Sequence, residues 1–254
     1  MLQYSYDGTF PGLLTVIFQS YSAKHWPDAI INPRETGVLF GDTVYVETDE
    51  NKASRVWEGV KKYGGLLTCE QLFHAFLSLD EDVELIILDY CKELFSQKVC
   101  IATNFANQSV LKVSQLEKKV LREAEHTLMF LRFEKAADGT WFAPVSPKYD
   151  VLPLITGHFR NRFADEPWLI YDTKRSYGYY FDTKKLEQIE IDNPAFNTIS
   201  GQLNRNATHT DENQWQEMWK TYFKQIAIRE RTNLKCQQNF MPKRFWKYLT
   251  EKKL

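Results

Sequence analysis

The chain has 254 residues, with 32 Lys and Arg against 33 Asp and Glu, which gives a formal net charge of −1. Hydrophobic residues make up 43% of it and aromatic residues 15%, so it has ample material for a core and is not intrinsically disordered. The longest clean apolar run, residues 13–18, is far shorter than the ~20 residues that cross a bilayer, so we expect no membrane helix and no membrane partner. The N-terminus lacks the basic region and cleavage site of a signal peptide.

The near-zero net charge hides a gradient along the chain. Residues 1–100 carry 8 basic and 15 acidic side chains, a net charge of −7, whereas residues 101–204 carry 13 of each. Residues 205–254 carry 11 basic and 5 acidic side chains, a net charge of +6. A strongly basic final fifth is typical of a segment that meets a polyanion, which the whole-chain charge does not suggest.

The cysteines and histidines indicate no metal site. No two of the four cysteines lie two or three residues apart, so the chain has no zinc knuckle and no redox CxxC pair. The five histidines never form an HxxxH or HExxH spacing. We therefore expect no metal, no cofactor, reduced core thiols and a cytoplasmic protein.

The first half of the chain is predicted to be mostly helical. Apolar residues recur at helical spacing over residues 10–22, and a short strand follows at 44–47. Thr48 or Asp49 can then cap a helix that ends at Gly64-Gly65. Further helices are expected at 68–78 and 83–95, and one long helix or two abutting ones at 108–126.

Strand-like patterns begin near residue 127. Residues 128–135 and 141–145 read as strands around a turn at 137–140, which predicts a β-hairpin, and Pro153 opens a predicted helix. The rest is expected to hold, in order, a hairpin of strands 168–172 and 178–182, a strand near 186–191, a loop at 192–210, a helix at 212–228, a polar turn, and a short helix from Met241-Pro242 through Tyr248.

These elements predict an α+β fold, because helices and hairpins are segregated along the chain and no run of βαβ units indicates a doubly wound sheet. The expected order is an N-terminal, mostly helical part with a short strand, two β-hairpins flanking a helix, and a C-terminal helical pair. Two domains are predicted, an N-terminal α/β part at 1–83 and a core at 84–254 with the hairpins and the basic C-terminal helices, although both can also pack as one domain.

The strongest candidate site is a basic, aromatic segment near the C-terminus. Its cations are Arg229, Arg231, Lys235, Lys243, Arg244 and Lys247, and its aromatic residues are Phe245, Trp246 and Tyr248. Such clusters attract phosphate backbones through Coulomb attraction and counterion release, and bases stack on aromatic rings. The alternative is a solvated basic terminus. Arg229 continues the apolar stripe of the preceding helix, so its guanidinium is expected to be partly buried and to need a carboxylate or a ligand phosphate.

A second candidate site surrounds the helix that Pro153 opens. His158 and Arg162 lie one turn apart on one helix face, where they can bind a phosphate or a carboxylate. The alternative for His158 is a core histidine, because two apolar residues precede it at helical spacing. The following hairpin adds Asp172 at a strand end and Arg175 in its loop. Arg175 can reach a nucleic-acid backbone, or Asp172 can pair with Arg162 or Arg175 in a purely structural role.

Catalytic residues are not identified by any motif. Glu125 and His126 are adjacent, and a carboxylate beside a histidine is the minimum for acid–base catalysis. Neighbouring helix residues point about 100° apart, however, so these two do not face each other. The chain has no GxSxG, Walker or GxGxxG motif. His158, Asp172 and His126 are therefore only weak catalytic candidates.

Several segments form one joint pattern over nearly the whole chain. They are Tyr6-Asp7-Gly8, Leu131-Arg132-Phe133 with Asp138-Gly139, His158-Phe159 with Arg162-Phe163, Pro167-Trp168-Leu169-Ile170-Tyr171-Asp172 with Arg175, Trp219-Lys220, Tyr222-Phe223, Arg229-Glu230-Arg231 and Met241-Pro242-Lys243-Arg244-Phe245-Trp246. Together they resemble a bacterial family described as DNA metabolism or DNA repair proteins. In that family the domain also occurs fused to uracil-DNA-glycosylase-like domains and is often encoded beside a radical S-adenosylmethionine protein.

Three functional hypotheses follow from the residues and this resemblance. The favoured one is a DNA-binding accessory protein in DNA repair or modification, which contacts phosphates through the basic C-terminal segment. The second is a metal-free enzyme that acts on a damaged or modified base. The third is a protein–protein adaptor for the radical S-adenosylmethionine enzyme, docked through the acidic first hundred residues. The partners expected are DNA and either that radical enzyme or a uracil-DNA-glycosylase-like protein.

Overall fold

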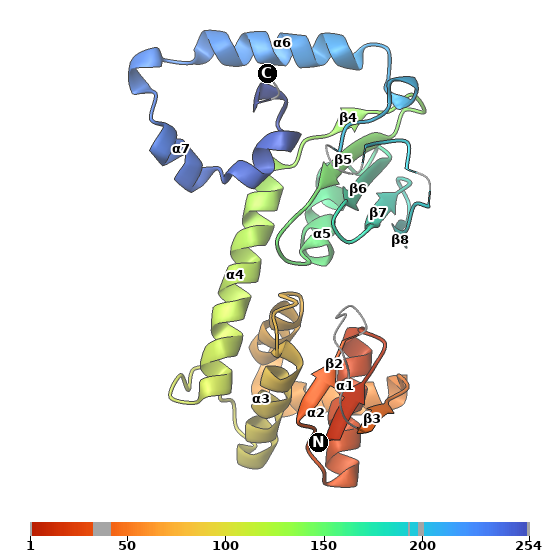
Figure 1. Cartoon of the computed structure of the whole chain (residues 1–254), viewed down its shortest axis with the longest axis vertical. Helices are drawn as coiled ribbons and strands as arrows, with labels where there is room; N and C mark the ends of the chain where they lie inside the picture. Colours follow the sequence, from red (N-terminus) through yellow and green to blue (C-terminus); the bar gives the residue numbers. More distant parts are fainter. Residues whose placement is uncertain (1, 33–41, 193, 198–200, 253–254) are drawn as a thin grey trace. The chain divides into compact units, whose positions relative to one another are not determined.

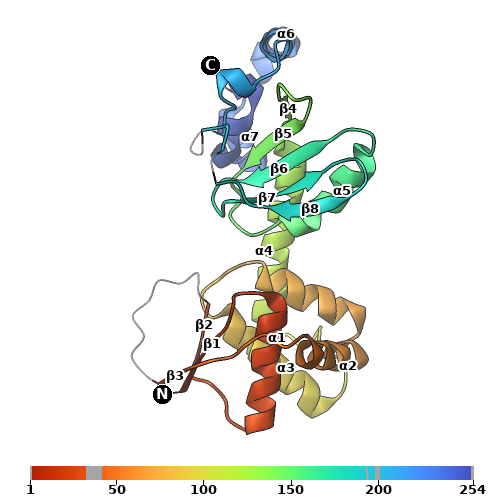
Figure 2. The same cartoon turned by 90° about the vertical axis from the view of Figure 1, so that its right-hand side faces the viewer.

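The computed structural model of this protein describes residues 2–32, 42–192, 194–197 and 201–252. The chain divides into two compact units, Met1–Leu121 and Arg122–Leu254, and each is described by itself (Figures 1 and 2). Helices and two sheets together confirm the predicted α+β class. The predicted domain boundary at residue 83/84 is a different division of the chain and stays a prediction.

The sheet of the first unit is parallel. Its central strand β1 (Leu2–Ser5) pairs in parallel with β2 (Ala29–Ile31) and with β3 (Asp42–Tyr45). Only β3 overlaps the strand expected at 44–47, because strands of three or four residues carry too little alternating pattern to be recognised. Parallel neighbours need a crossover connection, which the first helix supplies between β1 and β2.

Helix α1 (Phe10–Ala23) forms where its apolar spacing predicts it. The side chain of Thr9 caps it by accepting a hydrogen bond from the backbone N–H of Gly12 at 3.0 Å. Asp7 supports this cap, since its Oδ1 accepts from the Thr9 backbone N–H and hydroxyl. The inward face of α1 buries Leu13, Val16 and Ile17 completely.

Helix α2 (Glu50–Phe76) is two helices joined at a kink. Asp49 caps its start by accepting from two backbone N–H groups of the first turn. Gly65 has a φ of 76° and a ψ of −177°, which breaks the helix where the sequence predicts a stop. The second half coincides with the helix expected at 68–78. Helices α3 (Val83–Gln97) and α4 (Gln108–Phe130) follow.

Helix α4 corrects the expectation that residues 128–135 form a strand. The helix continues to Phe130, and only Glu134–Lys135 become a strand, β4. Its buried positions keep helical spacing to the end of the helix, as shown by Val120, Ala124, Thr127 and Leu131. This tertiary burial outweighs the local β-like composition of the segment.

The sheet of the second unit has the strand order β4-β5-β6-β7-β8. The remaining strands are β5 (Trp141–Val145), β6 (Trp168–Asp172), β7 (Tyr177–Phe181) and β8 (Leu186–Ile189). Both predicted hairpins are confirmed, as the antiparallel pairs β4–β5 and β6–β7. The hairpins are joined by a parallel β5–β6 pairing, which the sequence did not predict, with α5 (Leu152–Arg162) as the crossover. Helix α5 covers one face of this sheet (Figure 2).

The C-terminal part consists of short helices around one longer one. They are η1 (Arg205–Ala207), α6 (Glu212–Ile226), η2 (Arg229–Arg231), α7 (Leu234–Phe240), η3 (Lys243–Tyr248) and η4 (Thr250–Lys252). Helix α7 lies within the expected polar turn and is capped by Asn233, whose Oδ1 accepts from the Cys236 backbone N–H at 2.9 Å. Figures 1 and 2 show α6 beyond the β4 edge of the sheet. Among the described residues, no helix is both long and apolar enough to cross a membrane.

Candidate functional site

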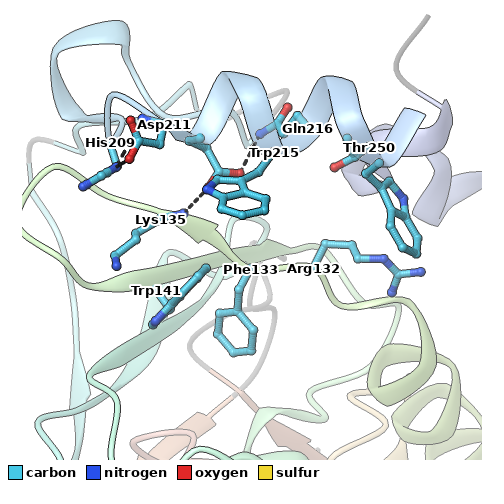
Figure 3. Close-up of a pocket in the computed structure, with 11 residues that line it drawn as sticks. Arg132, Phe133, Lys135, Trp141, His209, Asp211, Trp215, Gln216 and Thr250 are labelled. Carbon is cyan, nitrogen blue, oxygen red and sulfur yellow. Dashed lines mark hydrogen bonds and ion pairs between the residues drawn. The ribbon is translucent and has the colours of Figure 1, made fainter. Parts of the chain in front are cut away.

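A pocket of about 720 Å³ lies in the second unit between the β4–β5 hairpin and α6 (Figure 3). Its wall combines aromatic rings with charged groups from five segments: Arg132, Phe133 and Lys135 around β4, Trp141 of β5, His209 and Asp211 before α6, Glu212, Trp215, Gln216 and Trp219 of α6, and Thr250 of η4. Its size lies within the range of small-molecule and cofactor sites. We refer to it as the α6 pocket.

A buried carboxylate fixes the start of α6 against β4. The side chain of Glu212 accepts hydrogen bonds from the Lys135 backbone N–H at 3.0 Å and from the Gln216 side-chain amide at 3.0 Å. Glu212 is 6% exposed and stands in the first turn of α6, where negative charge is favoured by the helix dipole. This contact sets the position of the α6 face that lines the pocket.

A second carboxylate fixes the other end of the pocket. Glu251 accepts from the Trp219 indole N–H at 2.9 Å and pairs with the Arg132 guanidinium at 3.3 Å. The guanidinium also donates to the backbone carbonyls of Met129 and Leu131, both at 3.1 Å. Arg132 is thus anchored on several sides, and Trp219 is held as a wall of the pocket.

A smaller cavity of about 370 Å³ shares Phe133 and Trp141 with the α6 pocket. Its other lining residues are Phe163, Glu166 and Trp168, and we refer to it as the aromatic cavity. The Trp141 indole N–H donates to Glu166 Oε2 at 3.2 Å, which orients one wall. Trp168 is completely buried, and its Nε1 has no hydrogen-bond partner among the described residues.

The apolar stripe predicted for the last long helix is present but faces solvent. Trp215 is 63% exposed, Tyr222 54% and Ile226 55%, and Phe240 of α7 is 73% exposed. An amphipathic helix normally buries such a face against its own core, and contiguous exposed apolar surface marks interaction sites. This exposed face is therefore the second feature of the unit that suggests binding.

Two predicted phosphate ligands are occupied by carboxylates. Arg175 pairs with Asp172 at 2.6 Å and donates to the backbone carbonyls of Pro147 and Lys148 at 3.2 and 3.0 Å. Arg244 pairs with Glu123, whose side chain is 4% exposed. Both cations hold the fold together, and any contact of theirs with phosphate stays a prediction.

The other predicted ligands come from separate segments. Arg231 and Lys243 are exposed at η2 and η3, and Arg162 is exposed at the end of α5. The Trp246 indole N–H donates to the Met241 carbonyl at 3.0 Å. The side chain of Arg229 lies outside the part of the chain that the structure describes, so its expected partial burial stays a prediction. Neither the α6 pocket nor the aromatic cavity gathers these cations into one concave surface.

The three weak catalytic candidates stand in different surroundings. His158 is exposed on α5 and is therefore not the core histidine of the alternative interpretation. Asp172 is fully buried and accepts from the Lys174 and Arg175 backbone N–H groups, which shapes the β6–β7 turn. His126 is half-buried, and its burial lowers its pKa. None of the three lines a pocket described above, so a catalytic role for any of them stays a prediction.

Sequence reasoning missed the residues that form the pocket walls. Phe133 and Trp168 entered only as parts of the family pattern, and Trp141 and Glu166 carried no functional signal at all. Their proximity depends on the parallel β5–β6 pairing, which places Trp141 opposite Trp168. Within the described residues, no three His, Cys, Asp or Glu side chains are grouped to hold a metal ion.

Comparison with known proteins assigns a family. Over residues 81–251 the chain matches a family described as a domain of unknown function, DUF4130. All residues of the α6 pocket and the aromatic cavity lie inside this segment. No curated protein and no solved structure matches the chain.

Proposed function

The chain belongs to this family of unknown function, and we propose that it binds DNA with unpaired bases as an accessory protein in DNA repair or modification. The radical S-adenosylmethionine protein and the uracil-DNA-glycosylase-like protein that the resemblance implies are part of the same proposal. They are the partners that would supply the chemistry.

The observation that carries the proposal is the exposed surface of α6 and the segment after it. Both aromatic rings and cations are exposed there, at Trp215, Trp219, Tyr222, Lys224, Arg231, Lys235, Phe240 and Lys243. Proteins that bind single strands combine such stacking platforms with a positive track for the backbone. Stacking on an aromatic side chain contributes about 1–3 kcal/mol per base.

Two ion pairs reduce the number of cations that are free to bind phosphate on this surface. Arg175 and Arg244 are neutralised within the unit, so they contribute less to phosphate binding than their sequence position suggests. Arg231, Lys235 and Lys243 are exposed and remain the best phosphate contacts. The proposed surface therefore runs from α6 through η2 and α7 to Lys243 at the start of η3, rather than over the whole basic terminus.

The test is a titration of end-labelled single-stranded and duplex DNA, followed by fluorescence anisotropy. We expect tighter binding of the single strand, because only unpaired bases offer a face for stacking. Tyr222→Ala should weaken single-strand binding by about 1–3 kcal/mol, since it removes one stacking platform. Tyr45→Ala is the matched control, because Tyr45 is 63% exposed on β3 of the first unit.

Two results would overturn the proposal. One is the absence of binding to either form of DNA at low salt. The other is an equal loss of affinity in both tyrosine variants, since a specific surface on α6 requires that only Tyr222 matters.

The adaptor hypothesis is a second candidate, and the exposed surface of α6 offers it a docking site other than the acidic first hundred residues. Aliphatic side chains are exposed beside the aromatic ones, with Met218 at 54%, Ile226 at 55% and Ile228 at 52%. Such groups neither stack on bases nor contact phosphates, and they are typical of a protein interface. Size-exclusion chromatography with the purified neighbouring radical enzyme tests it, and separate elution of the two proteins contradicts it.

A further inference from the structure

We propose that the aromatic cavity binds one unstacked nucleobase. The inference rests on the proposed binding of DNA with unpaired bases, and it names the place where a single base is held. The cavity is lined by Phe133, Trp141, Phe163, Glu166 and Trp168.

The walls suit a flat, aromatic ligand. Four of the five lining residues are aromatic, and the cavity volume is about 370 Å³. The rings of Phe133 and Phe163 meet edge to face, with centroids 5.5 Å apart and planes at 77°. Aromatic walls can stack on the face of a flat ring, and extruded bases are held by stacking between aromatic or apolar side chains.

One polar group in the wall needs a partner. Trp168 is completely buried, and its indole N–H finds no acceptor among the described residues. Buried donors are nearly always satisfied in folded proteins, because leaving one unpaired costs the full desolvation of the group. Because Nε1 of Trp168 has almost no accessible surface, an acceptor atom of a ligand reaches it only when the side chains lining the cavity shift.

The second polar group of the wall is a carboxylate. Glu166 is exposed and accepts from the Trp141 indole N–H through Oε2 at 3.2 Å. Each carboxylate oxygen has two acceptor sites, so Glu166 can still accept from a ligand. The two polar groups of the wall are therefore complementary to a flat ligand that has both a hydrogen-bond acceptor and a hydrogen-bond donor.

The Watson–Crick edge of every nucleobase offers that combination. In a duplex this edge is occupied by the paired base, so only an unpaired or extruded base presents it. The chemistry thus selects unpaired bases without selecting one base identity.

Two cations flank the walls of the cavity. The Lys135 ammonium lies 5.3 Å from the Trp141 ring centroid, and the Arg162 guanidinium lies 5.8 Å from that of Phe163. Positive charge beside two walls favours a base that carries a phosphate. This gives Arg162, a predicted phosphate ligand, a specific position next to the cavity. A nucleotide within a strand and a free nucleotide share this chemistry.

The experiment uses strands that carry a single base. One is a short, end-labelled strand of abasic sugar-phosphate units with one central 2-aminopurine, and the other is the same strand without any base. We expect the full-length protein to bind the first about tenfold more tightly, because stacking and the two polar contacts require the base. Stacking should also quench the 2-aminopurine fluorescence. Deoxyadenosine monophosphate, titrated separately, represents the free nucleotide.

The variants separate the cavity from the general DNA surface. Trp168→Phe keeps a ring but removes the N–H, and it should lower affinity for the base-carrying strand about fivefold without changing affinity for the abasic strand. If Trp168→Phe does not fold, Phe163→Ala and Glu166→Gln test the cavity instead. Both side chains are exposed, so these substitutions leave the core of the unit intact. Phe105→Ala, an exposed phenylalanine of the first unit, is the matched control and should leave both affinities unchanged.

Each outcome decides between the two proposals. Equal and salt-dependent binding of both strands overturns the cavity proposal, whereas the proposed phosphate contacts of the DNA-binding surface stand and its base stacking is tested by Tyr222→Ala. If neither strand binds, the DNA-binding proposal fails, and the mononucleotide then decides. Binding of deoxyadenosine monophosphate that Phe163→Ala weakens supports a free nucleotide as the ligand, and no binding of it overturns the cavity proposal as well.

Discussion

Two of the predicted phosphate ligands show that a basic residue type alone does not distinguish a binding role from a structural one. The sequence places Arg175 and Arg244 in basic segments, but the structure pairs each with a buried carboxylate. Asp172 is three residues from its partner and was expected as an alternative, whereas Glu123 lies 121 residues from Arg244. Ion pairs between distant segments depend on the fold, so local charge alone cannot separate a binding cation from a structural one.

The buried pair at the β6–β7 turn yields a prediction for stability. Asp172→Ala should lower the free energy of unfolding by roughly 3 kcal/mol, because it leaves the Arg175 guanidinium without its carboxylate and two backbone N–H groups without an acceptor. Urea denaturation followed by circular dichroism measures this loss.

A second turn in the same sheet supplies the control. Asp182 also accepts from two backbone N–H groups of its turn, but its side chain is exposed and it has no buried cation to neutralise. Asp182→Ala should therefore cost less stability than Asp172→Ala. Equal losses would show that turn capping alone, and not the ion pair, makes Asp172 important.

At the scale of elements, local signals predicted most of the helices and hairpins. Helix caps such as Asp49 and the turn at Asp138-Gly139 are encoded within a few residues, and the structure confirms both elements they begin or join. The parallel pairings of β1 with its neighbours and of β5 with β6 join segments that are not adjacent in the sequence. The aromatic cavity depends on the β5–β6 pairing, so sequence patterns could not predict which residues line it.

Two glycines in helical segments test whether the kink in α2 depends on a backbone conformation that only glycine adopts. Gly65 lies at the α2 kink with a φ of 76°, whereas Gly157 lies within α5, and an added Cβ meets nothing within 4 Å at either position. Gly65→Ala should destabilise the protein by about 1–3 kcal/mol, since only glycine tolerates that backbone conformation. Gly157→Ala should stabilise it by about 0.5–1 kcal/mol through a better helix propensity and a less flexible unfolded chain.

Thermal unfolding of both variants beside the parent protein measures the difference. Because neither new methyl group meets a neighbour, opposite shifts of the midpoint report backbone conformation alone. An upward shift in both variants would mean that the α2 kink relaxes into a continuous helix at little cost, and a downward shift in both would contradict the prediction for Gly157.

At the scale of the whole molecule, the charge gradient along the sequence overstates the number of cations that are free to bind phosphate. The last segment, residues 205–254, has a net charge of +6, and the pair formed by Arg244 neutralises part of it within the second unit. Lys235 of α7 and Lys243 of η3 are exposed, and they are two of the proposed phosphate contacts that substitution can test. Binding that depends on them must weaken with salt, because each lysine that neutralises a phosphate releases condensed counterions from the strand.

The salt dependence of single-strand binding therefore tests how many phosphates these lysines neutralise. Lys235→Ala combined with Lys243→Ala should make the slope of log K against log salt concentration less negative by about 1.4, the change expected when two phosphates of a single strand are no longer neutralised by the protein. Lys61→Ala combined with Lys62→Ala, on α2 of the first unit, removes the same charge from exposed positions outside the proposed surface and should leave the slope unchanged. If both double variants change the slope equally, the dependence reflects net charge rather than specific phosphate binding, and the segment from α6 to η3 is not the DNA-binding surface.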